Sequence, residues 1–311
     1  MDRIAEAGFQ YIAFAYAPSF ITDGDPLKFT RKPLNTYSTE QLQEAFMMAR
    51  ERGLKIMLSA GVETDPGNLP EIDAEVQGEH SDGWYHALMD EWEDVMVETA
   101  RFAEEHDVEI FAVSNQFPFF GSIREEQVPM FNTLISDAIR NVNKAYTGKL
   151  TTDYYDGRIE FDYYRELDWL ADKWWGGLTT ELDPSLDELV EAAEQIVDKV
   201  YLPIYEAYGK PVFLQQLAYA SYDGAAGARQ ISTEAPEVAE WYPYDDSWPL
   251  DLQEQVDSYE ACFRVINGKE MFSGVFAFGY GYWDLQDKSS GFRGKPAEDV
   301  WIKWNEVLVE D

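Results

Sequence analysis

This chain of 311 residues has few cysteine and histidine residues and lacks the glycine-rich motifs of cofactor-binding folds. Cys262 is the one cysteine, so no disulfide can form within the chain, and its place in a predicted helix favours a core residue over a nucleophile. His80, His86 and His106 lack the paired spacing of a zinc site. No glycine fingerprint opens a helix as dinucleotide binding requires. We therefore expect no metal and no cofactor.

Basic residues are also few. Lysine and arginine number 24 against 59 acidic residues, which leaves a formal net charge of −35. A surface this negative repels phosphates and anionic lipids, so nucleic acids and membranes are poor candidates for partners. Because salt screens the self-repulsion of such a chain, the composition favours a salt-rich setting.

Long hydrophobic runs are missing as well. No segment approaches the roughly 18 consecutive apolar residues that a membrane helix needs, and no signal peptide opens the chain. Met1 leads directly into a helix-like pattern, so either the protein is intracellular or an N-terminal piece is missing. The sequence leaves the compartment and the oligomeric state open.

Apolar residues make up 45% of the chain and aromatic residues 15%, enough for a large core. Strand-like and helix-like patterns alternate without a linker, which predicts one α/β domain over residues 1–311. The predicted strands are 9–16, 54–59, 108–114, 149–154, 166–175, 211–217 and 274–280. The main predicted helices are 38–52, 84–106, 124–145, 185–208, 252–267 and 297–304, the first starting with a capping box at Ser38 and Gln41.

Seven predicted strands are one fewer than the eight that close a (β/α)8 TIM barrel. Because the first element is a helix, the simplest interpretation is that the first strand is missing from the N-terminus. A natural seven-stranded or oligomer-completed barrel is the alternative. Without that strand, the strands at 9–16 and 274–280 would present open edges.

Polar residues follow two of the predicted strands where these leave the core, which is where barrel enzymes place their chemistry. Asn115 and Gln116 follow strand 108–114, and Gln216 lies at the end of strand 211–217. With the missing strand counted first, these are the fourth and seventh strands. A retaining glycosidase needs two carboxyl groups about 5–5.5 Å apart, and residues from two such strands can face each other at that distance.

Four segments carry a resemblance to a known family. They are Y-T-G-K-L-T (146–151), L-D-W-L (167–170), G-K-P-V-F-L-Q-Q-L-A-Y-A-S (209–221) and R-G-K-P-A-E (293–298). In this order they resemble glycoside hydrolase family 113, clan A barrels that include endo-β-mannanases. The resemblance implies an acid/base residue at 116 and a nucleophile at 216, with Asn115 holding a sugar hydroxyl and Tyr219 supporting the nucleophile.

Both implied catalytic positions hold an amide, Gln116 and Gln216. Glutamine cannot act as the proton donor or as the attacking carboxylate, although its shape nearly matches glutamate. Three explanations stay open: an active glycosidase trapped by substitution of both glutamates, a natural and catalytically silent glycan-binding barrel, or an enzyme that uses other carboxylates. Candidates for the last are Asp153, Asp172 and Glu63.

Aromatic side chains gather at the predicted strand exits, where flat rings can stack on sugar faces. The expected substrate-binding residues, besides Asn115, are Tyr16, Asp153, Tyr154, Trp174, Trp175, Tyr219, Tyr280 and Trp283. Four other tryptophans are expected in the core: Trp92, Trp169, Trp301 and Trp304. The expected partner is therefore a β-linked oligosaccharide or polysaccharide, with the sugar and linkage open.

Overall fold

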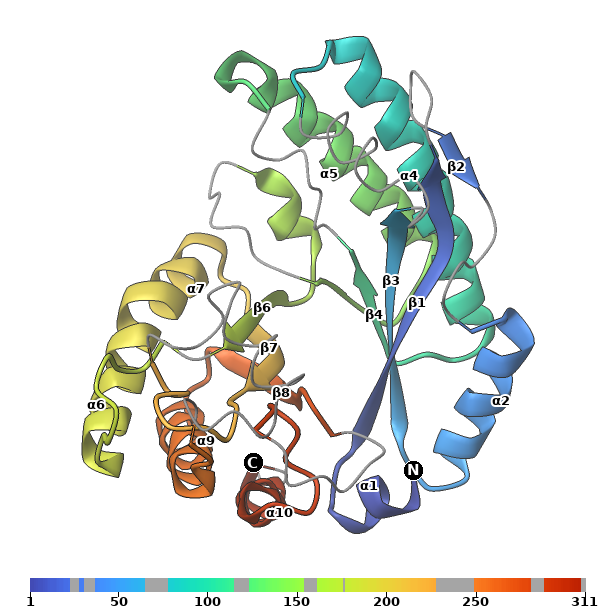
Figure 1. Cartoon of the computed structure of the whole chain (residues 1–311). Coiled ribbons are helices and arrows are strands. Elements are labelled where there is room, and N and C mark those ends of the chain that lie inside the picture. Colours follow the sequence, from blue (N-terminus) through green and yellow to red (C-terminus); the bar gives the residue numbers. More distant parts are fainter. Residues whose placement is uncertain are drawn as a thin grey trace. The chain divides into compact units, whose positions relative to one another are not determined.

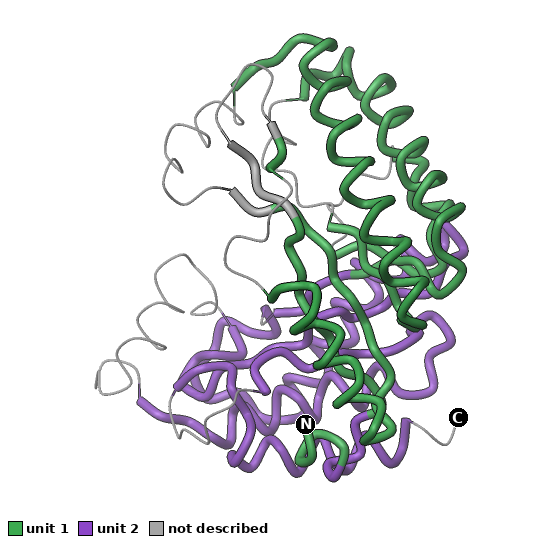
Figure 2. Tube along the Cα trace, turned by 90° about the vertical axis from the view of Figure 1, so that its right-hand side faces the viewer, with its two compact units in different colours: residues 1–5, 10–171 green, residues 6–9, 172–311 purple. Residues whose placement is uncertain are grey.

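The computed structural model describes residues 1–22, 28–30, 37–64, 78–114, 123–153, 161–175, 177–227, 249–280 and 288–308. In these ranges the chain has an α/β fold with parallel strands. It divides into two compact units, one made of Met1–Ala5 and Gln10–Ala171 and the other of Glu6–Phe9 and Asp172–Asp311 (Figure 2). The single domain predicted from the sequence stays a prediction.

The first unit is built on a sheet of order β2-β1-β3-β4-β5 (Figure 1). Its parallel strands are β1 (Tyr11–Thr22), β3 (Lys55–Thr64), β4 (Ile110–Val113) and β5 (Lys149–Thr152). The short β2 (Lys28–Thr30) pairs antiparallel with the end of β1, so part of the edge that was expected to be open has a partner. All four residues of β4 are buried, which confirms the doubly covered strand that its apolar run predicts.

The helices of this unit follow the predicted pattern. They are α1 (Asp2–Glu6), α2 (Thr39–Arg50), α4 (Asp82–Glu105) and α5 (Val128–Ala145), with short 3-10 helices η2 (Glu125–Gln127) and η3 (Asp162–Glu166). The capping box of α2 is confirmed: the Gln41 backbone N–H donates to Ser38 Oγ at 3.3 Å, and the Ser38 N–H donates to Gln41 Oε1 at 2.9 Å. Figure 1 shows α4 and α5 side by side, and the two helices pack on each other.

The second sheet has the order β6-β7-β8, with β6 (Leu170–Trp175), β7 (Val212–Ala218) and β8 (Phe272–Ala277), and from Asp172 onward its residues belong to the second unit. The helices of this unit are α6 (Leu186–Ile196), α7 (Leu202–Tyr208), α9 (Leu252–Ile266) and α10 (Pro296–Leu308). The helix predicted over 185–208 is interrupted by a π-helical turn, η4 (Val197–Tyr201). Pro203 follows this turn, and its missing N–H fits the broken hydrogen-bond pattern.

The strand predicted to start at Glu166 starts four residues later. Residues 162–166 form η3, in which Tyr163 and Tyr164 are buried, so the apolar residues there reflect helical packing. Asp168 then accepts the Leu150 N–H of β5 at 2.9 Å. Three of the tryptophans expected in the core, Trp92, Trp301 and Trp304, are buried, whereas Trp169 is partly exposed.

Candidate functional site

Gln216 lies near the carboxyl end of β7. It lies between Leu214 and Leu217, where the pairing of β7 with β8 shifts register at a bulge or irregularity. Gln216 is partly exposed, and its buried Oε1 has no hydrogen-bond partner among the described residues. Buried polar atoms are normally satisfied, so this oxygen is an acceptor available for a further hydrogen bond.

Four predicted site residues lie outside the described residues: Asn115, Gln116, Tyr154 and Trp283. The side chain of Glu63 is also outside the described part. Ser114, the last described residue after β4, donates its backbone N–H to the Ala60 carbonyl at 2.7 Å and continues the parallel pairing to β3. The pairing of Gln116 with Gln216 therefore stays a prediction.

Asp153 follows β5 and is 8% exposed. Its Oδ1 accepts a hydrogen bond from Ser59 Oγ at 2.6 Å, and its N–H donates to the Val113 carbonyl at 3.2 Å. The residue thus connects the middle of β3 with the ends of β4 and β5. Its carboxyl contacts β3 and its backbone N–H contacts the end of β4, so the residue helps to hold these three neighbouring strands in register.

Trp174 and Trp175 were predicted to lie at the site together, but adjacent residues of a strand point to opposite faces. Trp174 is 3% exposed and packs on Tyr201 of η4, with ring centroids 5.4 Å apart. Trp175 is partly exposed and lies 5.6 Å from the Phe278 ring. The structure therefore places Trp174 in the core beside the helices and leaves Trp175 as the candidate for stacking on a sugar.

Asp172 shares the helix-facing side of β6 with Trp174, and its carboxyl accepts a hydrogen bond from Tyr201. Burial raises the pKa of Asp172 to about 6, against the opposing effects of hydrogen bonds from the Lys173 backbone and Tyr201 and of the Lys173 charge. Because this carboxyl contacts the helix layer, its geometry does not favour the catalytic role that was considered for it.

Tyr16 and Tyr219, predicted to contact the substrate, are also in helix-facing positions. The Tyr16 hydroxyl is 3.5 Å from Thr39 Oγ1 at the start of α2. Tyr219 is fully buried, and its hydroxyl shares a hydrogen bond with Cys262 Sγ of α9 at 3.3 Å. Burial, followed by the nearby Cys262, raises the pKa of Tyr219 well above its usual value. The structure places both tyrosines in the core rather than beside a sugar.

Tyr280 follows β8 and is partly exposed. Its hydroxyl donates to Glu298 Oε1 of α10 at 2.7 Å, and its ring packs edge-on against Phe9 and Phe292. These contacts fix the orientation of the tyrosine. Of the described aromatic residues predicted for the site, Trp175 and Tyr280 are the two that keep an exposed portion near a strand end.

Glu254 is a residue that the sequence analysis did not single out. It lies in the first turn of α9, is 5% exposed, and accepts the backbone N–H groups of Gly224 and Ala226 from the segment after β7. Burial raises the pKa of Glu254 to about 7, because it outweighs those two hydrogen bonds, and the nearby Asp251 and Asp223 raise it further. Acidic residues are common in the first turn of a helix, where they interact favourably with the helix dipole. The sequence pattern around Glu254 therefore does not predict its contact with the backbone of Gly224 and Ala226.

The described residues contain no cluster of three or more His, Cys, Asp or Glu side chains arranged to hold a metal ion. Within the same residues, no helix has the length and apolar character required to cross a bilayer.

A family model for Glycoside Hydrolase Family 113 matches residues 1–299 of this chain. Among solved structures, a β-mannanase of this family from Alicyclobacillus acidocaldarius, in complex with ManMIm, is 20% identical over 98% of this chain and 90% of that chain, with a TM-score of 0.67. A β-1,4-mannanase of the family is 18% identical over 98% and 91%, also with a TM-score of 0.67.

A likeness in fold extends to fungal β-1,4-galactanases, at 12% identity over 96% of this chain and 89% of theirs, with a TM-score of 0.57. No curated protein sequence matches the chain significantly. The match of the family model over residues 1–299 establishes the family: the chain belongs to glycoside hydrolase family 113.

Proposed function

We propose that this chain binds a β-linked manno-oligosaccharide at the carboxyl ends of its strands and, with glutamine at positions 116 and 216, does not hydrolyse it. The observation that carries the proposal is Gln216, an amide at the end of β7 where the family resemblance implies the nucleophile. The mannanases of the family support the sugar class, and the likeness in fold supports a TIM-barrel type of fold.

The chemistry of an amide explains the loss of hydrolysis. A retaining glycosidase attacks the anomeric carbon with a carboxylate, and a second carboxyl group protonates the leaving oxygen. The neutral Gln216 oxygen is a poor nucleophile, and Gln116 has no proton of suitable pKa to give. The missing charge removes the covalent step while leaving a side chain of nearly the same shape.

The same amide retains the means to bind. Gln216 Oε1 lacks a partner among the described residues and accepts a sugar hydroxyl, while its Nε2 donates to another. Trp175 offers a partly exposed ring for stacking, and its indole Nε1 likewise lacks a hydrogen-bond partner in the described part of the chain. Binding by stacking and neutral hydrogen bonds suits an uncharged glycan.

Calorimetric titration with mannohexaose, cellohexaose and xylohexaose tests the binding. We expect measurable affinity for mannohexaose, weaker affinity for the other two, and no product after long incubation. The variant Gln216→Ala should lose roughly tenfold or more in affinity, as expected when a buried hydrogen-bonding partner is removed. Absence of binding to all three sugars would contradict the proposal.

Hydrolysis is tested by restoring both carboxyls in Gln116→Glu/Gln216→Glu. We expect this double variant to cleave mannohexaose with retention of configuration, which would identify the amides as the reason for inactivity. Gln215→Glu is the matched control, because it adds a carboxyl at the neighbouring buried residue of β7 and leaves an amide at position 216. Activity in the unaltered chain would contradict the proposal and favour other carboxylates.

A further inference from the structure

The segment that follows β7, residues 219–227, is held at several points by the start of α9. Its backbone N–H groups at Gly224 and Ala226 donate to the two oxygens of Glu254 at 2.8 and 2.7 Å. Gln255 Nε2 donates to the Tyr219 carbonyl at 2.7 Å. We call residues 219–227 the β7 exit segment.

The β7 exit segment is in turn joined to the residues that follow β6. The Ala226 carbonyl accepts the N–H groups of Leu178 and Thr179 at 2.8 and 3.3 Å, and Thr179 forms a parallel bridge with Gly227. The approach is so close that a Cβ at Gly227 would lie 1.7 Å from the Thr179 carbonyl oxygen. We call residues 177–180 the β6 exit segment.

These two segments begin next to the two described candidates for sugar contact. Trp175 is the last residue of β6, and Gln216 lies three residues before the β7 exit segment. Ala226 connects both partners: its N–H is bound by Glu254 and its carbonyl is bound by the β6 exit segment. A displacement of Ala226 would therefore disturb the backbone that follows both β6 and β7.

We propose that Glu254 is a positioning residue for the glycan site, whose carboxylate fixes the β7 exit segment and, through Ala226, the β6 exit segment, so that Gln216 and Trp175 keep the spacing that a sugar chain requires. The proposal rests on the proposed function for its ligand. The hydrogen bonds that it invokes do not depend on any ligand.

A carboxyl group suits this role, because both of its oxygens can accept an N–H group, and the hydroxyl oxygen of the protonated form keeps acceptor capacity. The acidic neighbours of Glu254 are Asp251, the N-cap of α9, and Asp223 of the β7 exit segment, and with burial they raise its pKa to about 7. Release of the segment would return this carboxyl toward its usual pKa, so by linkage the hold on the β7 exit segment should weaken as the pH rises through about 7.

The test compares Glu254→Gln with the matched control Glu260→Gln. Glu260 is also a buried carboxylate of α9, 8% exposed, but it accepts hydrogen bonds from Arg264, Lys303 and Trp304 and so contacts α10 instead of the exit segments. A glutamine at 254 would place an NH2 group against a backbone donor and lose one of the two hydrogen bonds.

Amide hydrogen exchange measures the hold directly. In Glu254→Gln we expect exchange at Leu178, Thr179, Gly224 and Ala226 to accelerate roughly tenfold or more, as for the loss of a buried hydrogen bond, with no change at these amides in Glu260→Gln. Equal exchange in the wild type and Glu254→Gln, or equal acceleration in both variants, would overturn the proposal.

Calorimetry with mannohexaose measures the consequence for binding. We expect the wild type to bind more weakly at about pH 8 than at about pH 6, since Glu254 ionises between them and its hold weakens. Glu254→Gln should bind roughly tenfold more weakly than the wild type at the lower pH, with little dependence on pH. Faster exchange with unchanged affinity would overturn the positioning role. If the wild type bound no glycan, the proposed function would fail, while the exchange comparison would still decide whether Glu254 holds the two segments.

Discussion

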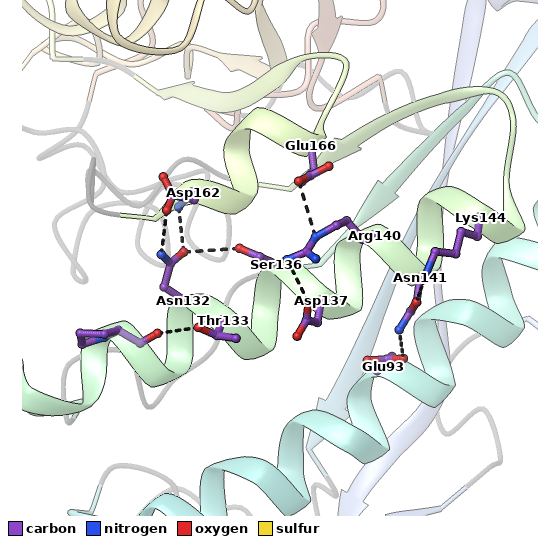
Figure 3. A network of polar contacts seen from close by, with 11 residues as sticks. Glu93, Asn132, Thr133, Ser136, Asp137, Arg140, Asn141, Lys144, Asp162 and Glu166 are labelled. Atoms are coloured by element: carbon purple, nitrogen blue, oxygen red, sulfur yellow. Dashed lines mark hydrogen bonds and ion pairs between the residues drawn. The ribbon is translucent and has the colours of Figure 1, made fainter.

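Several polar contacts of the first unit join exposed helix faces, whereas several of the second hold buried carboxylates against backbone and neighbouring helices. Figure 3 shows the first kind: Asn132 of α5 faces Asp162 of η3, and Arg140 reaches Asp137 and Glu166. The Arg140 side chain is 48% exposed. The carboxyls of the second unit are different, because Glu254, Glu260 and Glu298 are each less than a tenth exposed.

This difference separates two ways of stabilising the ends of strands. Exposed ion pairs contribute about 0–1 kcal/mol each and are screened by salt. Buried carboxylates are screened far less, and their desolvation couples the local structure to pH. We therefore expect the first unit to tolerate the loss of these exposed contacts, and the second to respond to substitutions and to pH at its strand exits.

The largest expected effect comes from a matched pair of glycines. In Gly227→Ala the new Cβ would meet the Thr179 carbonyl oxygen, a backbone atom, at 1.7 Å. In Gly148→Ala, in the first unit, it would meet the Tyr146 hydroxyl at 2.2 Å, the end of a side chain. We expect Gly227→Ala to lower the free energy of unfolding by about 3 kcal/mol or more, and Gly148→Ala by about half as much.

Urea unfolding of both glycine variants tests this ranking. Circular dichroism follows the unfolding, and the exchange of the Thr179 amide reports on the local change in Gly227→Ala. Equal losses in the two variants would break the contrast between the units, because they would show that the backbone approach at Gly227 is no more constrained than the side-chain contact at Gly148.

The elements themselves were predictable because their patterns are local. The apolar run of β4 predicted a doubly buried strand, and the Ser38 box predicted the start of α2. Residues 166–169 were wrongly predicted as strand. They form the end of η3 and the segment that contacts β5, and a sequence pattern does not distinguish such packing from a strand.

The candidate site was less predictable, because which face a residue occupies depends on tertiary packing. The sequence does not distinguish the adjacent Trp174 and Trp175, but strand alternation points Trp174 toward η4 and Trp175 to the opposite face. Tyr219 follows Gln216 at a plausible spacing, but its hydroxyl pairs with Cys262 of α9. Glu254 is distinguished by the backbone that folds over it, a contact between segments separated by about 30 residues, and no local motif encodes it.

The next prediction concerns pH and is smaller. The pKa of Asp172 is raised to about 6 and that of Glu254 to about 7, both above the values of the unfolded chain. Raised carboxyl pKa values mean that these groups contribute most stability below their unfolded pKa values and lose that contribution as the pH rises through the folded values. We expect Asp172→Asn to remove about 1 kcal/mol of the fall in unfolding free energy between about pH 4 and pH 7.

The control for this prediction is Asp162→Asn, since Asp162 belongs to the exposed contacts of the first unit. Chemical denaturation at a series of pH values gives, for each protein, the change in unfolding free energy with pH. The whole chain carries a large negative charge, so all variants should lose stability as the pH rises, and the difference between variants isolates the buried group. If the unfolding free energy of Asp172→Asn and of the wild type changed equally with pH, the raised pKa of Asp172 would be contradicted.

The smallest expected effect distinguishes a specific ion pair from the overall charge in the first unit. Arg140→Ala and Asp137→Ala break the same pair, in which Arg140 Nη2 lies 2.9 Å from Asp137 Oδ1, but they change the net charge of −35 in opposite directions. If the pair itself matters, both variants lose stability. We expect instead that self-repulsion dominates, so that at low salt Arg140→Ala destabilises by roughly 0.5 kcal/mol and Asp137→Ala is neutral or slightly stabilising. Thermal unfolding at about 0.05 M and 1 M salt measures both, and because a Debye length of about 3 Å at the higher concentration screens the repulsion, the two midpoints should converge there.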